Sequence, residues 1–279
     1  MTDGAWGTEL QRRGLRAGEC PDALNLTALG AVAEVARAYV DAGSQVILTN
    51  TFRANALSLA ACGLAERVRE INKAGALISR EATDGRALVF GSIGPTGEVL
   101  ALCEDLRDRL FDIFAEQATA LAEGGVDAIV IETMSDVGEA KIALAAARST
   151  GLPVVVSFAF DTGRNKDRTM TGVTPEQAAI ALTEAGASAV GANCGAGIET
   201  AIGICRRLHA ATDLPLWLKP NAGLPRVVGD RIKYDVGPED FASQAPALVQ
   251  AGAAFVGACC GSNPAFISAC ARVLRPACA

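Results

Sequence analysis

Histidine is almost absent from the sequence, and aromatic residues are few. Among 279 residues there is one histidine, His209, and aromatic residues make up 5%. His209 lies beside Arg206 and Arg207 in a helical pattern, so a solvated surface position is expected for it. A Ser-His-Asp triad or a metal site with histidine ligands therefore has no histidine to use.

The sequence also lacks the features of nucleic-acid-binding and membrane proteins. The formal net charge is −6, the pI is about 5.0, and no block of basic residues is present. No nucleic-acid partner is therefore expected. No apolar run reaches about 18 residues, so no membrane span is predicted. The first residues carry neither the charged nor the apolar segment of a secretory signal.

The cysteine content does not fit a disulfide framework. Nine cysteines are an odd number, and a chain of 279 residues buries a core without covalent cross-links. Free thiols or metal ligands in a reducing compartment fit better, so we predict a cytoplasmic location. Six cysteines scattered over helices and loops are expected to be small buried or surface side chains: Cys20, Cys62, Cys103, Cys205, Cys270 and Cys278.

Short apolar runs alternate with longer helical patterns along the chain. The runs are rich in Val, Ile, Leu and Phe and nearly continuous in apolarity, as in strands that are covered on both faces. Strands are predicted over residues 45–50, 87–93, 127–133, 153–160, 188–194, 214–219 and 253–259. Helices are predicted over residues 31–42, 65–83, 105–123, 136–149, 175–185, 198–211, 238–250 and 264–274.

This alternation predicts parallel strands joined by right-handed crossovers. An eighth strand has to precede the first helix, where only the residues around Met1 and Asp3 are available. We therefore predict an α/β fold, a single-domain (β/α)8 TIM barrel over residues 1–279 with a short or incomplete first strand. The alternative is an open doubly wound sheet, but residues 4–8 do not form the glycine-rich phosphate loop that it would need.

Three cysteines lie at the ends of predicted strands. Cys194 closes the sixth strand, and Cys259 and Cys260 close the eighth. Carboxyl ends of barrel strands form the active-site face, and three thiolates there could hold a zinc ion with its fourth position open. Alternatively, one of the adjacent cysteines is buried and the other exposed, because neighbouring side chains on a regular strand point to opposite faces. Gly261 would allow the strand to break and both thiols to bind.

Other polar residues are expected at the same face. Asn221 ends the strand between the two cysteine strands, and Asp3 comes close when the first strand closes on the eighth. Glu132 ends the fourth strand, across the mouth of the barrel. Two alternatives stay open: Glu132 as a structural carboxylate bonded to backbone amides, and Asp3 as the cap of a loop.

The residue types indicate a reaction of a thiol. Zinc with three thiolates carries a net negative charge, so it is a poor Lewis acid but lowers the pKa of a bound substrate thiol. Attack of that thiolate on an electrophilic methyl group then needs mainly alignment. Asp3 and Glu132 could hold an ammonium group, and the backbone amides of Gly4 and Ala5 a carboxylate. An amino acid with a side-chain thiol fits all these groups.

Seven motifs in order resemble the zinc-dependent homocysteine S-methyltransferase family. The match spans nearly the whole chain, through residues 3–9, 49–55, 91–98, 131–134, 193–195, 219–223 and 257–261. The resemblance implies a (β/α)8 barrel and an enzyme that methylates homocysteine to methionine.

The resemblance also implies roles for individual residues. The zinc ligands match Cys194, Cys259 and Cys260, and the homocysteine contacts match the Asp3-Gly4-Ala5 loop and Glu132. Asn221 is the candidate for the fourth zinc site before homocysteine arrives.

The methyl donor differs among relatives. The motifs resemble both the homocysteine module of cobalamin-dependent methionine synthase and bacterial proteins described as betaine-dependent. The donor is therefore either a small onium compound, such as glycine betaine or S-methylmethionine, or methylcobalamin. Because the chain has no room for a cobalamin domain, the second case needs a corrinoid partner protein. In contrast to the family pattern, only Met1 and Thr2 precede the first motif, so the first strand is short or begins upstream.

Two other functions fit parts of the sequence. The absence of a donor domain would suit a non-catalytic zinc- or homocysteine-binding subunit of a larger methyltransferase complex. Lys219, at the end of a predicted strand, would suit a barrel lyase that forms a Schiff base.

Overall fold

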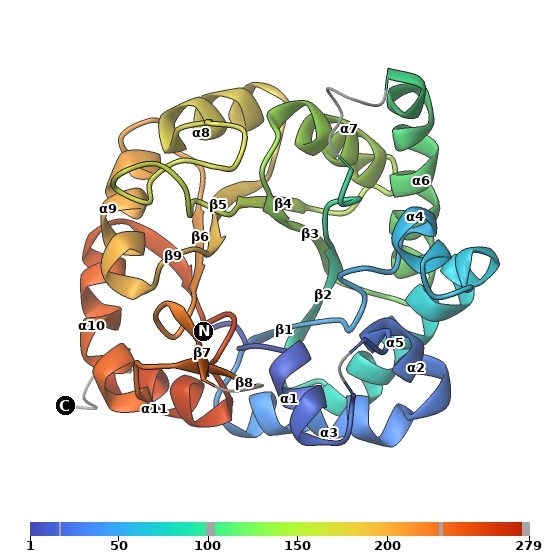
Figure 1. Ribbon diagram of the computed structural model, residues 1–279, viewed down its shortest axis with the longest axis horizontal. Coiled ribbons are helices and arrows are strands. Elements are labelled where there is room, and N and C mark those ends of the chain that lie inside the picture. The colour runs from blue at the N-terminus through green and yellow to red at the C-terminus, as the bar shows by residue number, and fades with distance from the viewer. Residues whose placement is uncertain (17, 99–103, 229–230, 275–279) are drawn as a thin grey trace.

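The strands form a ring that is surrounded by helices (Figure 1). The computed structural model describes residues 1–16, 18–98, 104–228 and 231–274. Neighbouring strands of the ring are parallel and follow the order β1-β2-β3-β4-β5-β6-β9. Their bounds are β1 Val46–Leu48, β2 Leu88–Ile93, β3 Ala128–Met134, β4 Val154–Phe158, β5 Ala189–Cys194, β6 Leu216–Pro220 and β9 Ala253–Val256.

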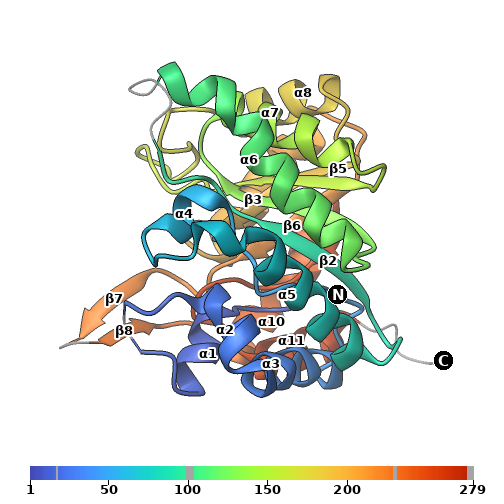
Figure 2. The ribbon, with the colours of Figure 1, turned by 90° about the vertical axis from the view of Figure 1, so that its right-hand side faces the viewer.

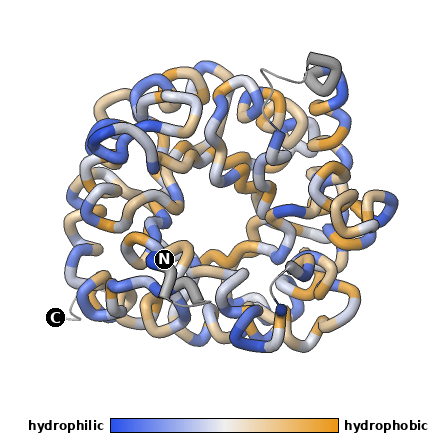
Figure 3. Tube along the Cα trace, in the orientation of Figure 1, coloured by the Kyte–Doolittle hydropathy of each residue, from blue (hydrophilic) through white to orange (hydrophobic). Residues whose placement is uncertain are grey.

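In the described part of the chain, eight longer helices form the outer layer of the barrel (Figure 1). They are α3 Leu29–Asp41, α5 Val68–Thr83, α6 Glu104–Glu123, α7 Val137–Arg148, α8 Pro175–Glu184, α9 Ile198–His209, α10 Pro238–Gln250 and α11 Pro264–Leu274. Shorter helices are α1 Gly7–Arg12, α2 Leu24–Thr27 and α4 Ala56–Ala60, with 3-10 turns at Pro21–Ala23 and Ala65–Arg67. Hydrophobic residues gather along the strands, and hydrophilic ones on the outer turns (Figure 3). The predicted strands and helices are therefore confirmed, with small shifts at their ends.

The first residues of the chain close the barrel between β9 and β1. The Thr2 amide donates to the Val256 carbonyl (2.9 Å), and the Gln45 amide donates to the Met1 carbonyl (2.9 Å). The segment Met1–Asp3 thus occupies the place of the eighth strand, beside β9 and β1 (Figure 1). The predicted single-domain barrel is confirmed with seven parallel strands in the described residues, and the segment predicted as a short or incomplete first strand is bonded to β9 and β1 without being a strand itself.

Aromatic residues are few, but three of them fill the inside of the ring. Trp217 of β6 is fully buried, and its ring lies 5.9 Å from that of Phe90 and 5.3 Å from that of Phe255. Small and branched side chains of β1, β3, β4 and β5 complete this inner layer. Since the layer blocks the interior, a ligand can enter only above it, at the ends of the strands.

A two-stranded antiparallel ribbon projects from the barrel after β6 (Figure 2). It consists of β7 Pro225–Val228 and β8 Arg231–Tyr234, with Pro225 paired to Tyr234. None of the strands predicted from the sequence covers these residues, because two strands of four residues show too little periodicity to be detected.

Most of the cysteines lie within the described residues. All seven cysteines within the described ranges are free thiols; Cys205 and Cys270 are buried, and Cys62 is exposed. The two others, Cys103 and Cys278, lie outside the described residues. Within those ranges, none of the helices has the length and apolarity to cross a membrane.

The closure of the barrel leaves no space for a side chain at residue 257. A Cβ atom on Gly257 would lie 1.9 Å from Thr2 Oγ1 and 2.7 Å from the Asp3 carbonyl. We expect Gly257→Ala to lower the free energy of unfolding by about 1–3 kcal/mol through overpacking. Chemical denaturation measures this. The control is Gly203→Ala, in the exposed interior of α9 with open space around it, which should stabilise by roughly 0.5–1 kcal/mol. Equal effects of the two substitutions would contradict the described closure.

Candidate metal and substrate site

A cavity of about 450 Å³ opens above the inner layer, at the carboxyl ends of the strands. Its wall combines the loop after Asp3, the loop after β1, and the ends of β2, β3, β5 and β6. The lining residues include Gly4, Ala5, Ser92, Glu132, Lys219, Cys194, Cys259 and Cys260. The structure therefore brings most of the sequence-predicted site residues to one cavity.

The three predicted ligand cysteines meet at the floor of this cavity. Cys194 Sγ lies 3.2 Å from Cys259 Sγ, which lies 4.0 Å from Cys260 Sγ. All three sulfur atoms lie within 4.8 Å of one another. Both adjacent cysteines can face one point because β9 already ends at Val256 and the chain turns at Gly261, where φ is +84°. The alternative of one buried and one exposed cysteine is therefore wrong.

Thiols this close cannot all be ionised without a cation. Hydrogen bonds from Cys194 and Cys259 lower the pKa of Cys260 to about 3. Hydrogen bonds with Cys259 and Cys260, and burial, raise the pKa of Cys194 well above its usual range. Ionisation of one thiol thus disfavours ionisation of its neighbours. A divalent cation would allow the other protons to leave, so the donor set fits a tetrahedral metal with three sulfur ligands.

Asn193 holds the ends of three strands in place beside the thiols. Its Oδ1 accepts hydrogen bonds from the Thr133 amide (2.8 Å) and Ser157 Oγ (2.7 Å), and its Nδ2 donates to Thr133 Oγ1 (2.7 Å). Thr133 and Cys194 both adopt positive φ angles, +62° and +58°. Such strained backbone persists only where the surroundings fix it. Asn193 therefore helps to set the direction of the Cys194 side chain. It was not among the predicted site residues.

Asn221 contributes a polar atom that lacks a partner. Its Nδ2 donates to the Gly195 carbonyl (2.8 Å), and its amide donates to the Cys194 carbonyl (3.2 Å). Its Oδ1 is buried and has no hydrogen-bond partner within the described part of the chain. A buried acceptor without a partner is costly, and the backbone of Asn221 is hydrogen-bonded to Cys194, so a cation bound near that cysteine would supply the missing partner.

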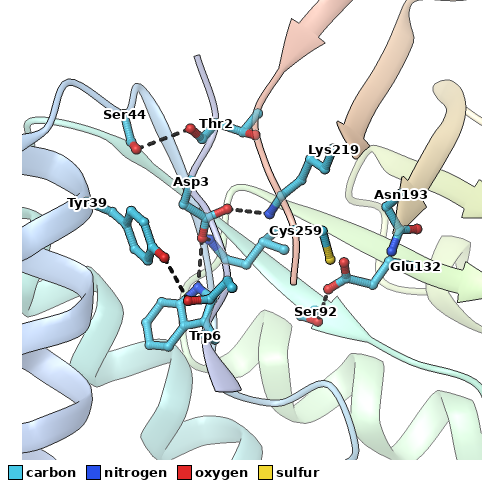
Figure 4. Close-up of polar contacts among 12 residues, drawn as sticks. Thr2, Asp3, Trp6, Tyr39, Ser44, Ser92, Glu132, Asn193, Lys219 and Cys259 are labelled. Carbon is cyan, nitrogen blue, oxygen red and sulfur yellow. Dashed lines mark hydrogen bonds and ion pairs between the residues drawn. The ribbon is translucent and has the colours of Figure 1, made fainter. Parts of the chain in front are cut away.

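Both carboxylate oxygens of Asp3 are bonded to protein groups (Figure 4). Its Oδ1 pairs with Lys219 Nζ, and its Oδ2 accepts from Trp6 Nε1 (2.7 Å) and the Leu48 amide (2.8 Å). Asp3 is fully buried. Asp3 was predicted to bind a substrate ammonium, but in the structure it binds the ammonium of Lys219. No local pattern in the sequence indicates this pairing, because the two residues lie 216 positions apart.

Lys219 is a buried cation beside the thiols. Only 2% of its side chain is exposed. Burial by itself lowers the pKa of Lys219, but the negative charges of Asp3, Glu132 and Cys259 outweigh it and raise that pKa. A Schiff-base lysine needs the neutral amine. The lyase alternative therefore has no support at this residue.

Glu132 faces the cavity from the end of β3. Ser92 Oγ donates to its Oε1 at 2.5 Å (Figure 4). Burial raises the pKa of Glu132 to about 7, although the Lys219 charge acts in the opposite direction. Glu132 is thus a buried carboxyl whose pKa lies near neutral pH. A substrate ammonium bound beside it would lower that pKa and favour the ionised carboxylate.

The loop after Asp3 is held rigidly. The Ala5 amide donates to Ser262 Oγ (3.1 Å), and Tyr39 Oη donates to the Ala5 carbonyl (2.7 Å). A Cβ atom on Gly4 would lie 2.7 Å from Ser262 Oγ. A substrate carboxylate could bind the Ala5 amide only by replacing Ser262, so the Gly4 amide is the more accessible of the two predicted donors.

Buried amide side chains position the loop after β1. Asn25 Nδ2 donates to the Asn50 carbonyl (2.8 Å), and Gln117 Nε2 donates to the Thr51 carbonyl (2.8 Å). Both side chains are fully buried. The sequence analysis missed these residues. The only signal was a polar amide on the apolar face of a helix, which is too common to indicate a role.

One family accounts for nearly the whole chain. The sequence model described as homocysteine S-methyltransferase matches residues 1–274. The chain belongs to the homocysteine S-methyltransferase family. The resemblance predicted from the motifs is confirmed, and with it the prediction of a methyltransferase.

Individual relatives agree with this family. Methionine synthase of Mycobacterium tuberculosis is 30% identical over 297 aligned residues, which cover 98% of this chain and 25% of that protein. For methionine synthase of Mycobacterium leprae the identity is 30%, over 94% of this chain and 23% of that protein. This member of the homocysteine S-methyltransferase family thus spans about a quarter of the length of these relatives.

Solved structures show the same fold. The metallated form of the homocysteine methyltransferase MmuM from Escherichia coli is 25% identical, with a TM-score of 0.80 over 96% of this chain and 94% of that chain. Its oxidized form is 24% identical with a TM-score of 0.79, over 96% and 93% of the two chains.

The raised pKa of Glu132 predicts a pH-dependent stability difference. Its pKa is about 7 in the folded protein and 4.5 ordinarily, so folding favours the protonated form and stability falls as the pH rises through this window. Relative to wild type, metal-free Glu132→Gln should gain up to about 3 kcal/mol of unfolding free energy between pH 4.5 and 7. Urea denaturation across this range measures the difference, with the surface variant Glu184→Gln as control. A difference that does not change with pH would contradict the buried environment of Glu132.

Proposed function

We propose that this chain transfers a methyl group to the thiol of homocysteine and forms methionine, with zinc held by Cys194, Cys259 and Cys260. The main support for the proposal is that three cysteine sulfurs, from the end of β5 and from the turn after β9, lie within 4.8 Å of one another. Zinc is the metal that three thiolates favour in a tetrahedral site with one open position. When bound, it would keep the homocysteine sulfur ionised and nucleophilic near neutral pH.

Residues around the thiols would bind the amino-acid part of homocysteine. Glu132 lines the cavity and accepts only the Ser92 hydroxyl among the described residues, so its carboxyl would take the substrate ammonium. The Gly4 amide would take the substrate carboxylate. Asp3 would act indirectly, by holding Lys219 and the loop that carries Gly4 and Ala5.

Asn221 would occupy the open metal position in the absence of substrate. Its buried Oδ1 lacks a hydrogen-bond partner among the described residues, and its backbone amide is hydrogen-bonded to the Cys194 carbonyl. An oxygen there would occupy the fourth position until the substrate sulfur arrives, because sulfur is the ligand that zinc in a thiolate-rich site prefers.

The cavity leaves room for a donor next to the substrate. Its volume of about 450 Å³ falls within the range of pockets for small ligands, about 300–1,000 Å³. A small onium compound, such as glycine betaine or S-methylmethionine, would deliver its methyl group from the open side. The chain itself would supply alignment and exclude water, and it needs no general base once the thiol has lost its proton.

A second candidate follows from the length of the relatives. Since the chain spans about a quarter of the methionine synthases, the donor could be methylcobalamin on a corrinoid partner protein that docks at the cavity mouth. In the extreme case, the chain is a non-catalytic zinc- and homocysteine-binding subunit of such a complex. The free thiols suit a reducing compartment, so the cytoplasmic location stays a prediction.

An assay with separate donors tests the proposed reaction. The purified chain of known zinc content is incubated with homocysteine and, in separate tubes, glycine betaine, S-methylmethionine, S-adenosylmethionine or methylcobalamin. Methionine should form with one donor and identify it. If every tube is silent while zinc and homocysteine bind, the isolated chain lacks a partner, and the second candidate, with a corrinoid partner protein, replaces the small onium donor. If homocysteine does not bind to the zinc-loaded chain, the proposal is wrong.

Removal of one sulfur ligand tests the metal site. Cys259→Ser should lose most of its zinc and nearly all methyl transfer while keeping its circular dichroism, because a hydroxyl is a much poorer zinc ligand than a thiolate. Elemental analysis after dialysis against a weak chelator measures the zinc content. The matched control is Cys62→Ser, which removes an exposed thiol outside the cavity and should keep one zinc per chain. Retained zinc and turnover in Cys259→Ser would contradict the assignment of Cys259 as a zinc ligand.

A further inference from the structure

Lys219 is the one buried cation on the described wall of the cavity, and the proposed reaction gives it no role. It lies in β6, between the two strands that carry the thiols. Its neighbour Pro220 accepts a hydrogen bond from the Cys259 amide (2.8 Å). In the register of the sheet, Lys219 is paired with Asn193, the residue before Cys194. The backbone of Lys219 is therefore fixed relative to both cysteine strands.

The Lys219 ammonium is also fixed from below. It lies 5.8 Å from the centre of the Trp217 ring, in the inner layer of the barrel. On one side it pairs with Asp3 Oδ1 (Figure 4). A lysine ammonium has three donors, and Asp3 is its only hydrogen-bond partner among the described residues. The other two N–H groups thus remain for the cavity, where Glu132 and Cys259 lie.

Asp3 does not fully neutralise the positive charge of Lys219. The Asp3 carboxylate shares its negative charge with the Trp6 indole and the Leu48 amide, which donate to its other oxygen. In the proposed complex, three thiolates and a divalent metal carry one net negative charge, and a homocysteine thiolate makes it two. Excess negative charge in a buried site is costly unless a cation lies near.

We propose that Lys219 is a positioning residue whose fixed positive charge offsets the negative charge of the thiolate cluster and so stabilises the ionised form of the bound substrate thiol. This inference rests on the proposed function. It differs from a purely structural role, in which Lys219 only neutralises Asp3. Under a structural role, removal of both charges would leave the substrate thiol unaffected.

A set of variants separates the two roles. Lys219→Met removes the cation, Lys219→Met/Asp3→Asn removes both charges and leaves no unpaired buried ion, and Lys219→Arg keeps the cation. Each protein is loaded with cobalt(II), whose sulfur-to-metal absorption reports when homocysteine binds as a thiolate. The midpoint of this signal is measured against pH, and thermal unfolding is followed in parallel.

The expected result is an upward shift of the midpoint by about 1–2 pH units in both methionine variants, the size of a charge interaction over several Å at an effective dielectric constant of about 20. The double variant should unfold at a higher temperature than Lys219→Met, since it holds no unpaired buried carboxylate. Lys219→Arg should keep the wild-type midpoint.

Two failures are distinguishable. If the double variant has the wild-type midpoint, Lys219 serves only the fold, and this inference is wrong while the proposed function stands. If the wild-type protein itself shows no cobalt-thiolate signal on addition of homocysteine, the proposed function fails, and the inference falls with it.

Discussion

A buried ion pair between Asp3 and Lys219 connects the closure of the barrel to its site. Asp3 belongs to the segment that fills the gap between β9 and β1, and Lys219 belongs to β6, next to the cysteine strands. Both side chains are almost fully buried. Loss of one partner from such a pair typically costs about 3–5 kcal/mol, because the other charge stays buried without compensation. The first residues of the chain thus help to fix the position of the thiols, although they contribute no ligand themselves.

The inner apolar layer and the polar cavity lie at different levels along the axis of the barrel. Below the ion pair, Trp217 and its aromatic neighbours fill the ring with side chains that carry no charge. Above it, the ends of the strands carry thiols, a carboxyl and amides around one cavity. The strained backbone of Thr133 and Cys194 lies on this upper side, where Asn193 holds it. This arrangement keeps the sulfur atoms close together in spite of their repulsion as thiolates, and it makes the site ready for a cation.

Periodicity and punctuation in the sequence predicted the elements of the fold, because buried parallel strands and amphipathic helices leave strong local patterns. The three cysteines could be predicted to meet, since strand ends converge in a barrel. The Asp3–Lys219 pair could not be predicted, because it joins residues from opposite ends of the chain. For the same reason, Asn193 and the buried amides Asn25 and Gln117 were missed: their roles depend on tertiary contacts and not on a local pattern. The β7–β8 ribbon was too short to be detected.

The most direct test of the account is the number of sulfur atoms bound to zinc, measured by X-ray absorption at the zinc edge of the purified, zinc-loaded chain. We predict three sulfur ligands and one lighter ligand without substrate, and four sulfur ligands after addition of homocysteine. Fewer than three sulfur ligands in the resting protein would contradict the assigned cysteines. An unchanged sulfur number after addition of homocysteine would contradict the binding of the substrate thiol to the metal.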